Sequence, residues 1–318
     1  MSTAKNKTVL SGVQPSGKLH IGNYLGAIKN FISMQNDYNC FFCIVDLHAI
    51  TVKHDPKILR NNTLEVAATY LASGIDPKRS VIFNQSSISA HAELAWIFNC
   101  VTRMGWLNRM TQFKDKAGKD KENASSGLFI YPNLMAADIL VYKATHVPVG
   151  NDQKQHLELT RDIAQKFNRD YNCENFFPIP EPIFNKDISR IMSLKDGNQK
   201  MSKSDLSDYS RISLLDESDA IIKKIKKAKT ADMLMPDKID DVIKLREVDN
   251  LVNIYSGFSG INKQKLIDQY KGQNFSKFKS DLSEVIVEQI RPITNEIKKL
   301  MQNKDFLLEI MLEGQNKA

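Results

Sequence analysis

Short apolar runs alternate with helical patterns through the first half of the chain, and this alternation restricts the fold more than any other feature. The apolar runs cover 8–13, 39–46, 79–84 and 145–150, and the helical patterns cover 21–36, 56–73, 90–101 and 153–168. Strands joined by crossover helices form a parallel sheet with helices on its faces. The pattern therefore predicts an α/β fold with a doubly wound, Rossmann-like parallel sheet.

Three polar segments follow expected strands directly, at 14–16, 46–48 and 150–153. Ligands of an open parallel sheet bind beyond the carboxyl ends of its strands. We therefore expect the three segments to line one crevice.

The strand pattern stops near residue 212, whereas helical spacing continues. The later helical patterns cover 216–229, 247–258, 262–270 and 275–301. We therefore expect two domains, a Rossmann-like domain over 1–211 and a smaller α-helical domain over 212–318.

The composition is ordinary for a globular protein, with 42% hydrophobic and 25% charged residues. No apolar run approaches the roughly 18 residues that a membrane-spanning helix needs. The polar segment 1–7 is too short for a signal peptide. We expect a cytoplasmic protein without a membrane partner.

The four cysteines do not indicate a metal site. Cys40 and Cys43 have the spacing of half such a site. They fall in an expected buried strand, however, where residues three apart point to opposite faces. Cys100 and Cys173 have no neighbouring ligand pairs. We therefore expect reduced thiols and no protein-bound metal.

The net charge of +7 is compatible with a polyanionic partner. Five lysines gather in one helical pattern, at Lys223, Lys224, Lys226, Lys227 and Lys229. Neighbouring isoleucines make this pattern amphipathic. A solvated helix face and a polyanion-binding face both fit it.

A first chemical motif, Pro-Ser-Gly-Lys-Leu-His-Ile-Gly-Asn, occupies 15–23 between an expected strand and an expected helix. Gly22 would let a ligand approach the backbone, and His20 and Asn23 would add side-chain donors. A helix N-terminus also offers free N–H groups to phosphate. The segment predicts a phosphate-binding turn.

A second motif, Lys-Met-Ser-Lys-Ser, occupies 200–204 after a polar stretch at 195–199 that we expect to be mobile. Lys200 and Lys203 on such a loop can close over a polyphosphate. Alone this motif is most often a solvated loop, and a single His20 is most often a surface or core residue. Their occurrence in this order favours a nucleotide site.

Together the two motifs resemble the His-Ile-Gly-His and Lys-Met-Ser-Lys-Ser signatures of the class I aminoacyl-tRNA synthetases. Asn23 stands at the fourth position of the first signature, as in the tryptophanyl members. The resemblance covers essentially the whole chain. It implies activation of L-tryptophan by ATP to tryptophanyl-adenylate and transfer to tRNA(Trp). It also implies Mg²⁺ with the ATP, a homodimer, and tRNA anticodon binding by the helical domain.

The resemblance assigns catalysis to Lys200, Lys203, Lys116, His20 and Asn23. The lysines would hold the leaving pyrophosphate, and the other two would hold the triphosphate in line. No general base is needed, because the tryptophan carboxylate is already a nucleophile. The ATP-binding set implied is Gln14, Pro15, Ser16, Gly22, Asn23, Gly150, Asn151, Asp152, Ile191, Lys200, Met201, Ser202, Lys203 and Ser204.

The position of the third lysine is open. The segment 114–123 has no apolar periodicity and predicts a charged loop, either merely solvated or placed near the nucleotide. It resembles a family loop whose lysine reaches the ATP phosphates. Lys116 matches best, and Lys114 and Lys119 remain alternatives.

Tyr131, Met135 and Asp138 share one face of an expected helix. From the pattern alone, Asp138 is an exposed flank residue or a buried acceptor at about even odds. By resemblance it accepts the indole N–H, and Met135 replaces a glutamine of the tyrosyl enzymes, which favours tryptophan. An unpaired buried carboxylate would then reject phenylalanine. The other tryptophan-binding residues implied are His48, Gln153, Gly12, Val147 and Val149.

His54, His91 and His146 have no match in the family and are interpreted as structural, whereas the roles of His156, Glu158 and Arg161 stay open. Three rival functions remain. A tyrosyl enzyme shares both signatures, and a related nucleotidyltransferase would lack the second signature and the helical domain. A non-catalytic RNA-binding paralogue is disfavoured by the joint presence of Lys200, Lys203, Asp138 and Asn23.

Overall fold

The structure is a computed structural model that describes residues 7–111, 113, 122–150, 153–184 and 190–318. Lys116, its alternatives Lys114 and Lys119, and the predicted nucleotide residues Asn151 and Asp152 lie outside these ranges.

A five-stranded parallel sheet forms the centre of the N-terminal part, in the order β3-β2-β1-β4-β5. Its strands are β1 (Thr8–Val13), β2 (Asn39–Ile44), β3 (Ser80–Asn84), β4 (His146–Pro148) and β5 (Glu181–Ile183). The predicted doubly wound parallel sheet is confirmed. Of these five strands only β5 was not expected from the sequence, because it has three residues including Pro182 and shows no apolar run.

Helices surround the sheet, and three short elements replace the single helix expected over 21–36. These are α1 (Ile21–Asn23), a π-helical turn (Tyr24–Ile28) and α2 (Lys29–Met34). The remaining helices of this part are α3 (Asp46–Ala49), α4 (Pro56–Ala72), α5 (Ala90–Val101), α6 (Met104–Asn108), α8 (Ser126–Val141) and α9 (Lys154–Asp170). Asp55 caps α4 by accepting from the Lys57 and Ile58 N–H groups, and Pro56 suits the first helical position.

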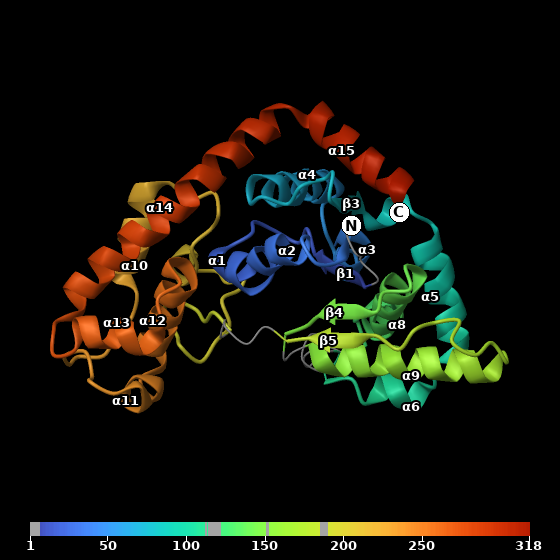
Figure 1. Ribbon diagram of the computed structural model, residues 1–318, viewed down its shortest axis with the longest axis horizontal. Coiled ribbons are helices and arrows are strands. Elements are labelled where there is room, and N and C mark those ends of the chain that lie inside the picture. The colour runs from blue at the N-terminus through green and yellow to red at the C-terminus, as the bar shows by residue number, and fades with distance from the viewer. Residues whose placement is uncertain (1–6, 112, 114–121, 151–152, 185–189) are drawn as a thin grey trace, which may run out of the picture.

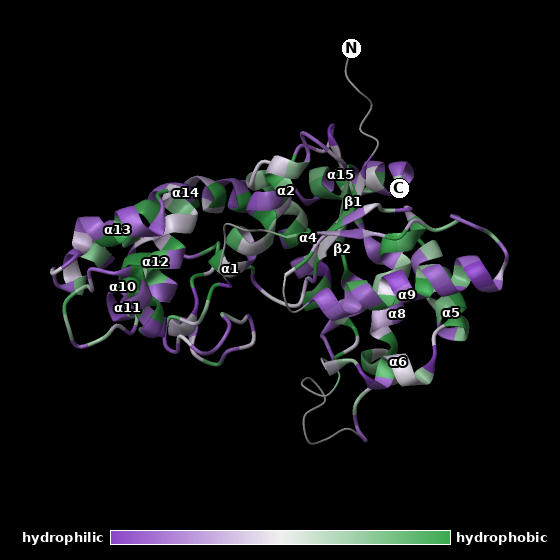
Figure 2. Cartoon of the chain, turned by 60° about the horizontal axis from the view of Figure 1, so that its bottom comes forward, coloured by the Kyte–Doolittle hydropathy of each residue, from purple (hydrophilic) through white to green (hydrophobic). Residues whose placement is uncertain are grey.

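The C-terminal part is helical, as predicted. It contains α10 (Ser218–Lys227), α11 (Ile239–Lys244), α12 (Arg246–Ser259), α13 (Lys263–Tyr270), α14 (Phe275–Gln302) and α15 (Lys304–Lys317). The long helix α14 runs from the cluster of helices α10–α13 back over α4 (Figure 1). Hydrophilic and hydrophobic residues alternate along it (Figure 2), and one hydrophobic cluster joins Phe42 of β2 to Ile225 of α10 and Ile290 of α14.

Helix α15, which was not expected from the sequence, covers the edge strand β3. Gly314 approaches this strand so closely that a Cβ there would lie 1.7 Å from the Ile82 carbonyl oxygen. The Gln315 side chain donates to the Ser87 carbonyl oxygen at 3.1 Å. The helix therefore shields an edge that would otherwise expose unpaired backbone groups. Among the described residues, no helix has the length and apolar character to span a membrane.

Candidate active site

The two motifs meet directly although they lie far apart in the sequence. The ammonium of Lys203 donates to the Gln14 carbonyl oxygen at 2.8 Å. Gly17 has φ +146°, and a Cβ there would lie 3.7 Å from Lys203 Cβ. Because glycine adopts positive φ without strain, it permits this close turn. The first motif thus contacts the loop at 200–204 through Gln14 and Gly17.

His20 and Asn23 form a capping box at the start of α1. The His20 Nδ1 accepts from the Gly22 N–H at 3.1 Å, and the Asn23 Oδ1 accepts from the His20 N–H at 3.1 Å. The Ile21 N–H donates to the Ile212 carbonyl at 3.0 Å. The expectation of free N–H groups at this helix end is therefore wrong, because side chains and the segment after the second motif already satisfy them.

His20 is a neutral donor in this arrangement. Burial, with further contributions from Lys203, Arg211 and Lys200, lowers the pKa of His20 to about 3. Since Nδ1 accepts a hydrogen bond, the single proton lies on Nε2. The imidazole can therefore donate to a phosphate oxygen without carrying a charge.

Lys203 is half-buried, and burial lowers the pKa of its ammonium to about 8, against the opposing influence of Glu65. Glu65 is a buried carboxyl of α4 that no sequence pattern singled out. Burial raises the pKa of Glu65, which Lys18 and Lys203 partly offset. The chain thus places a carboxyl behind the two signatures, within their electrostatic reach.

The second motif is held against the segment 191–193. The Met201 N–H donates to the Ile191 carbonyl at 3.1 Å, and the Ser193 N–H donates to the Gln199 carbonyl at 2.7 Å. Lys200 and Met192 form an isolated antiparallel bridge. Ile191 and Met201 are both buried here, so the predicted adenine-side residues do lie together. Ser202 and Ser204 hydroxyls are 2.9 Å apart at the outer end of the loop.

Asp138 is buried and already bound by three donors. Its Oδ2 lies 2.7 Å from His48 Nε2, and its Oδ1 lies 2.7 Å from His91 Nδ1 and 2.7 Å from Gln85 Nε2. The structure therefore favours the buried-acceptor interpretation. His91 is more than a packing residue, because it holds this carboxylate and also meets the Tyr142 hydroxyl at 2.8 Å.

The pKa of Asp138 is lowered, because His48 and His91 outweigh the opposing effect of burial. A carboxylate can accept about four hydrogen bonds. Of the three donors that bind Asp138, only His48 binds Oδ2. One acceptor position therefore fits a further N–H donor. The expectation that Asp138 would stand unpaired without indole is wrong, and the penalty for an analogue without N–H is correspondingly smaller.

Among the remaining predicted pocket residues, Tyr131 lies beside His48, which binds Asp138. The Tyr131 ring lies 6.0 Å from the His48 ring, and its hydroxyl meets His156 Nε2 at 2.9 Å. Met135 packs on a hydrophobic cluster that contains Val147, Val149 and Leu10. Gly12 is exposed at the end of β1, where an ideal Cβ would meet the Cys43 carbonyl oxygen at 2.8 Å. Gln153 stands at the start of α9 and donates through its backbone to the Gly150 carbonyl at 3.0 Å.

Gln85 could have been found from the sequence. It follows the expected strand 79–84, so the rule that singled out the other three segments also applies to it. His91 carries no such local signal. The same holds for Asn250, whose side-chain amide binds the Met192 backbone, because helices bring both residues to the site from distant parts of the chain.

A family model described as "tRNA synthetases class I (W and Y)" matches residues 2–290. The chain belongs to this family of class I tRNA synthetases. A relative from Brucella melitensis named tryptophan–tRNA ligase is 52% identical and aligns with 100% of this chain and 94% of its own length. One from Rickettsia conorii with the same name is 55% identical over 98% of this chain and 94% of its own.

Solved structures of synthetases agree with this membership. A tryptophanyl-tRNA synthetase from Campylobacter jejuni, crystallised with ADP and tryptophan, has 35% identity and a TM-score of 0.81 over 98% of this chain and 94% of its own. A tyrosyl-tRNA synthetase from Aeropyrum pernix has a TM-score of 0.72 at 18% identity, over 94% of this chain and 90% of its own. At this identity, the tyrosyl enzyme shows only that the two chains share a fold.

The basic face of this synthetase is smaller than the sequence indicates. Lys223, Lys226 and Lys227 are exposed on α10. Lys229 is also exposed but pairs with Glu247 at 2.8 Å. Lys224 is buried and does not belong to the face, because its ammonium lies 2.7 Å from a carboxylate oxygen of Asp208 and 2.7 Å from one of Asp216.

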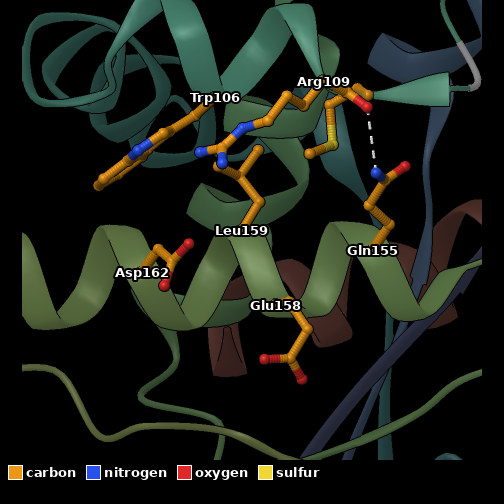
Figure 3. Close-up of a pocket in the computed structure, with 7 residues that line it drawn as sticks. Trp106, Arg109, Gln155, Glu158, Leu159 and Asp162 are labelled. Carbon is orange, nitrogen blue, oxygen red and sulfur yellow. Dashed lines mark hydrogen bonds between the residues drawn. The ribbon is translucent and has the colours of Figure 1, made fainter.

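A cavity of about 220 Å³ between α6 and α9 lies apart from both signatures. Trp106, Arg109, Leu159, Glu158 and Asp162 line it, and the Gln155 amide donates to the Arg109 carbonyl at 3.1 Å (Figure 3). Glu158 borders this cavity, but its carboxylate points away from Trp106 and Arg109 (Figure 3) and lies 3.6 Å from Arg161 Nε. Arg161 also donates to the Pro180 carbonyl at 2.8 Å. His156 is buried against Tyr131.

Proposed function

We propose that this synthetase activates L-tryptophan with ATP and transfers the tryptophanyl group to tRNA(Trp), as a tryptophan–tRNA ligase. The contact between Lys203 and the Gln14 carbonyl carries the proposal, because it closes both signatures over one crevice. A relative with 35% identity was crystallised with ADP and tryptophan, which supports a nucleotide site in this crevice.

The first step needs charge stabilisation rather than acid–base chemistry. A carboxylate oxygen of tryptophan attacks the α-phosphorus of ATP, a new P–O bond forms, and the bond to the bridging oxygen breaks to release pyrophosphate. Lys200, Lys203 and Lys116 stabilise the charge that develops on the leaving group. The Nε2–H of neutral His20 and the Asn23 amide nitrogen donate to the triphosphate.

The ammonium of Lys203 changes its hydrogen-bond acceptor during this step. Its ammonium donates to the Gln14 carbonyl in the structure, and a phosphate oxygen replaces that neutral acceptor when ATP binds. Hydrogen bonds to a charged acceptor are roughly twice as strong as neutral ones. The exchange therefore draws the loop onto the nucleotide.

Further residues complete the ATP site. The predicted set Gln14, Pro15, Ser16, Gly22, Gly150, Asn151, Asp152, Ile191, Met201, Ser202 and Ser204 surrounds the adenosine and phosphates. Mg²⁺ enters with ATP on its phosphate oxygens, the usual mode for this ion. No metal bound by the protein alone is required.

Tryptophan lies beside Asp138, with its indole N–H directed to the remaining acceptor position on Oδ2. Met135, Val147 and Val149 enclose the ring, since methionine is an adaptable surface for an aromatic group. Tyr131, His48 and Gly12 border the pocket, and Gln153 meets the charged ammonium and carboxylate of the substrate.

The helical domain, with a boundary near residue 212, binds the tRNA and its anticodon. Lys223, Lys226 and Lys227 supply an exposed positive face for phosphates. The site acts in the cytoplasm, where the four free cysteines stay reduced.

A second copy of the chain packs on α5 and α6 to form a homodimer. Trp96 is 70% exposed, Met104 64% and Ile97 42%, all in these consecutive helices. Exposed large apolar side chains of this kind mark protein interfaces. Light scattering of wild type and Trp96→Glu tests the assembly, and an unchanged mass would refute this interface.

Amino-acid-dependent exchange between pyrophosphate and ATP, with each of the twenty amino acids and no tRNA, tests the activation step. We expect exchange with tryptophan alone. Exchange with tyrosine would refute the interpretation of Asp138 and Met135. The absence of exchange with every amino acid would favour a binding protein over an enzyme.

A further inference from the structure

Lys224 is the one member of the lysine cluster at 223–229 that points into the protein, and nothing in the proposed chemistry uses it. It lies on α10, which packs on α14 at the far side of the helical part from the sheet (Figure 1). Lys224 is only 4% exposed. A buried ammonium destabilises a protein unless it is paired with an acceptor. A buried lysine at this position therefore implies partners that it holds in place.

The two partners of Lys224 belong to the chain directly after the second signature. Asp208 and Asp216 each place a carboxylate oxygen 2.7 Å from Nζ. Lys224 is the leading cause of a lowered pKa at Asp208, which therefore stays ionised. Lys227 of the same helix lies 4.6 Å from the centre of the Tyr209 ring. Helix α10 thus grips the segment 208–216 at several points.

This segment connects both signatures. On one side, Arg211 donates to the Asp205 carbonyl at 2.8 Å, directly after the Lys-Met-Ser-Lys-Ser loop. On the other, Asp216 Oδ2 accepts from the Ser213 N–H at 2.9 Å. Ser213 in turn pairs with His20 in an antiparallel bridge, flanked by bonds from the Leu214 N–H to the Leu19 carbonyl at 2.9 Å and from the Ile21 N–H to the Ile212 carbonyl at 3.0 Å.

We propose that Lys224 is a positioning residue for adenylate formation, because its paired ammonium holds segment 208–216 and thereby sets the His20 turn relative to the Lys203 loop. The inference rests on the proposed roles of His20 and Lys203. It assigns helix α10 two faces, an outer one with exposed lysines and an inner one that organises the ATP site. The inner face acts without any tRNA present.

Lys224→Met removes the charge and keeps the length of the side chain. In tRNA-free exchange we expect its kcat to fall about 10- to 100-fold, as small misplacements of reacting groups do, with KM for tryptophan within about twofold. Lys224→Arg retains the charge and should recover part of the loss. Lys244→Met is the matched control, because it breaks the exposed pair between Lys244 and Asp241 on α11 and should keep wild-type kcat.

Hydrogen exchange separates positioning from general stability. We expect Lys224→Met to lose amide protection at 205–216 and 19–23 while α12 and α14 keep theirs. Equal loss of protection throughout, or wild-type kcat in a folded Lys224→Met protein, would overturn the inference. Should that variant not fold, Asp208→Asn removes only the exposed partner, and a wild-type kcat there would also count against the inference. An inactive wild type would instead refute the proposed function.

Discussion

Asn250 of α12 binds both backbone groups of Met192. Its Oδ1 accepts from the Met192 N–H at 2.8 Å, and its Nδ2 donates to the Met192 carbonyl at 2.9 Å. Met192 forms an isolated bridge with Lys200, so a side chain of the helical part holds the segment that pairs with the second signature.

Replacing Asn250 with alanine leaves the Met192 N–H and carbonyl without these partners. We expect a loss of about 2 kcal/mol in unfolding free energy, the scale for buried unsatisfied polar groups. Urea denaturation measures it. Gln269→Ala, at an exposed position of α13, should stay within about 0.5 kcal/mol of wild type, and equal effects of the two changes would contradict the assigned role.

Lys203→Ala should slow adenylate formation far more than it weakens tryptophan binding. The loss of one preorganised donor to a developing charge costs roughly 10²- to 10³-fold in rate. A rapid-quench burst of adenylate reports the rate, and fluorescence titration reports tryptophan affinity. A burst at the wild-type rate would remove Lys203 from the mechanism.

The pH dependence of kcat/KM for ATP should show a decline on the alkaline side. Burial lowers the pKa of Lys203 to about 8, and kcat/KM reports ionisations of the free enzyme. The protonated ammonium is the active form, so activity is full below that pKa and falls as pH rises through it. His20, with a pKa of about 3, stays neutral above pH 5 and adds no acid limb there. A flat profile between pH 7 and 9.5 would refute this assignment.

The combined change of Lys223 and Lys226 to glutamine should raise KM for tRNA and flatten its salt dependence. Removing a lysine that neutralises one phosphate reduces the slope of log K against log salt by roughly one. Pyrophosphate exchange without tRNA should remain intact, because these two lysines lie outside the ATP crevice and Lys227, which lies over the Tyr209 ring, is left in place. Unchanged tRNA kinetics would mean that the face is merely solvated.

Gly314→Ala should destabilise the protein, because its Cβ would lie 1.7 Å from the Ile82 carbonyl oxygen and α15 must move off β3. We expect a loss of about 2 kcal/mol, within the range for overpacking. Gly105→Ala is the matched control, since no atom lies within 4 Å of the Cβ it would carry. Thermal unfolding compares them, and similar melting temperatures would show that α15 adjusts without cost.

Local patterns were sufficient for most of the fold. The apolar run at 8–13 coincides with β1, and the stripe at 275–301 coincides with α14, one residue short. Such patterns succeed because burial of one face repeats every second residue in strands and every three to four in helices. β5 was not predicted because it has only three residues, including Pro182. The buried residues of α15, Leu307, Met311 and Gly314, do recur at helical spacing, so this helix could have been predicted from the sequence.

The site was predicted as a set of residues but not as a set of contacts. Resemblance named Asp138 and His20, and both are buried polar groups with partners. The partners of Asp138 include Gln85, directly after β3, and His91 of α5, whose distance from α8 in sequence hides the contact.

The sequence by itself determined the family, the order of most strands and helices, and the two signatures, because periodicity and motif spacing are local properties of the chain. Only the tertiary structure decided that Lys224 turns inward while Lys223 remains exposed, since both fit an amphipathic helix equally well. The difference arises from Asp208 and Asp216, which the fold brings to one side of α10. A buried charge is tolerated only where such partners lie within hydrogen-bonding distance.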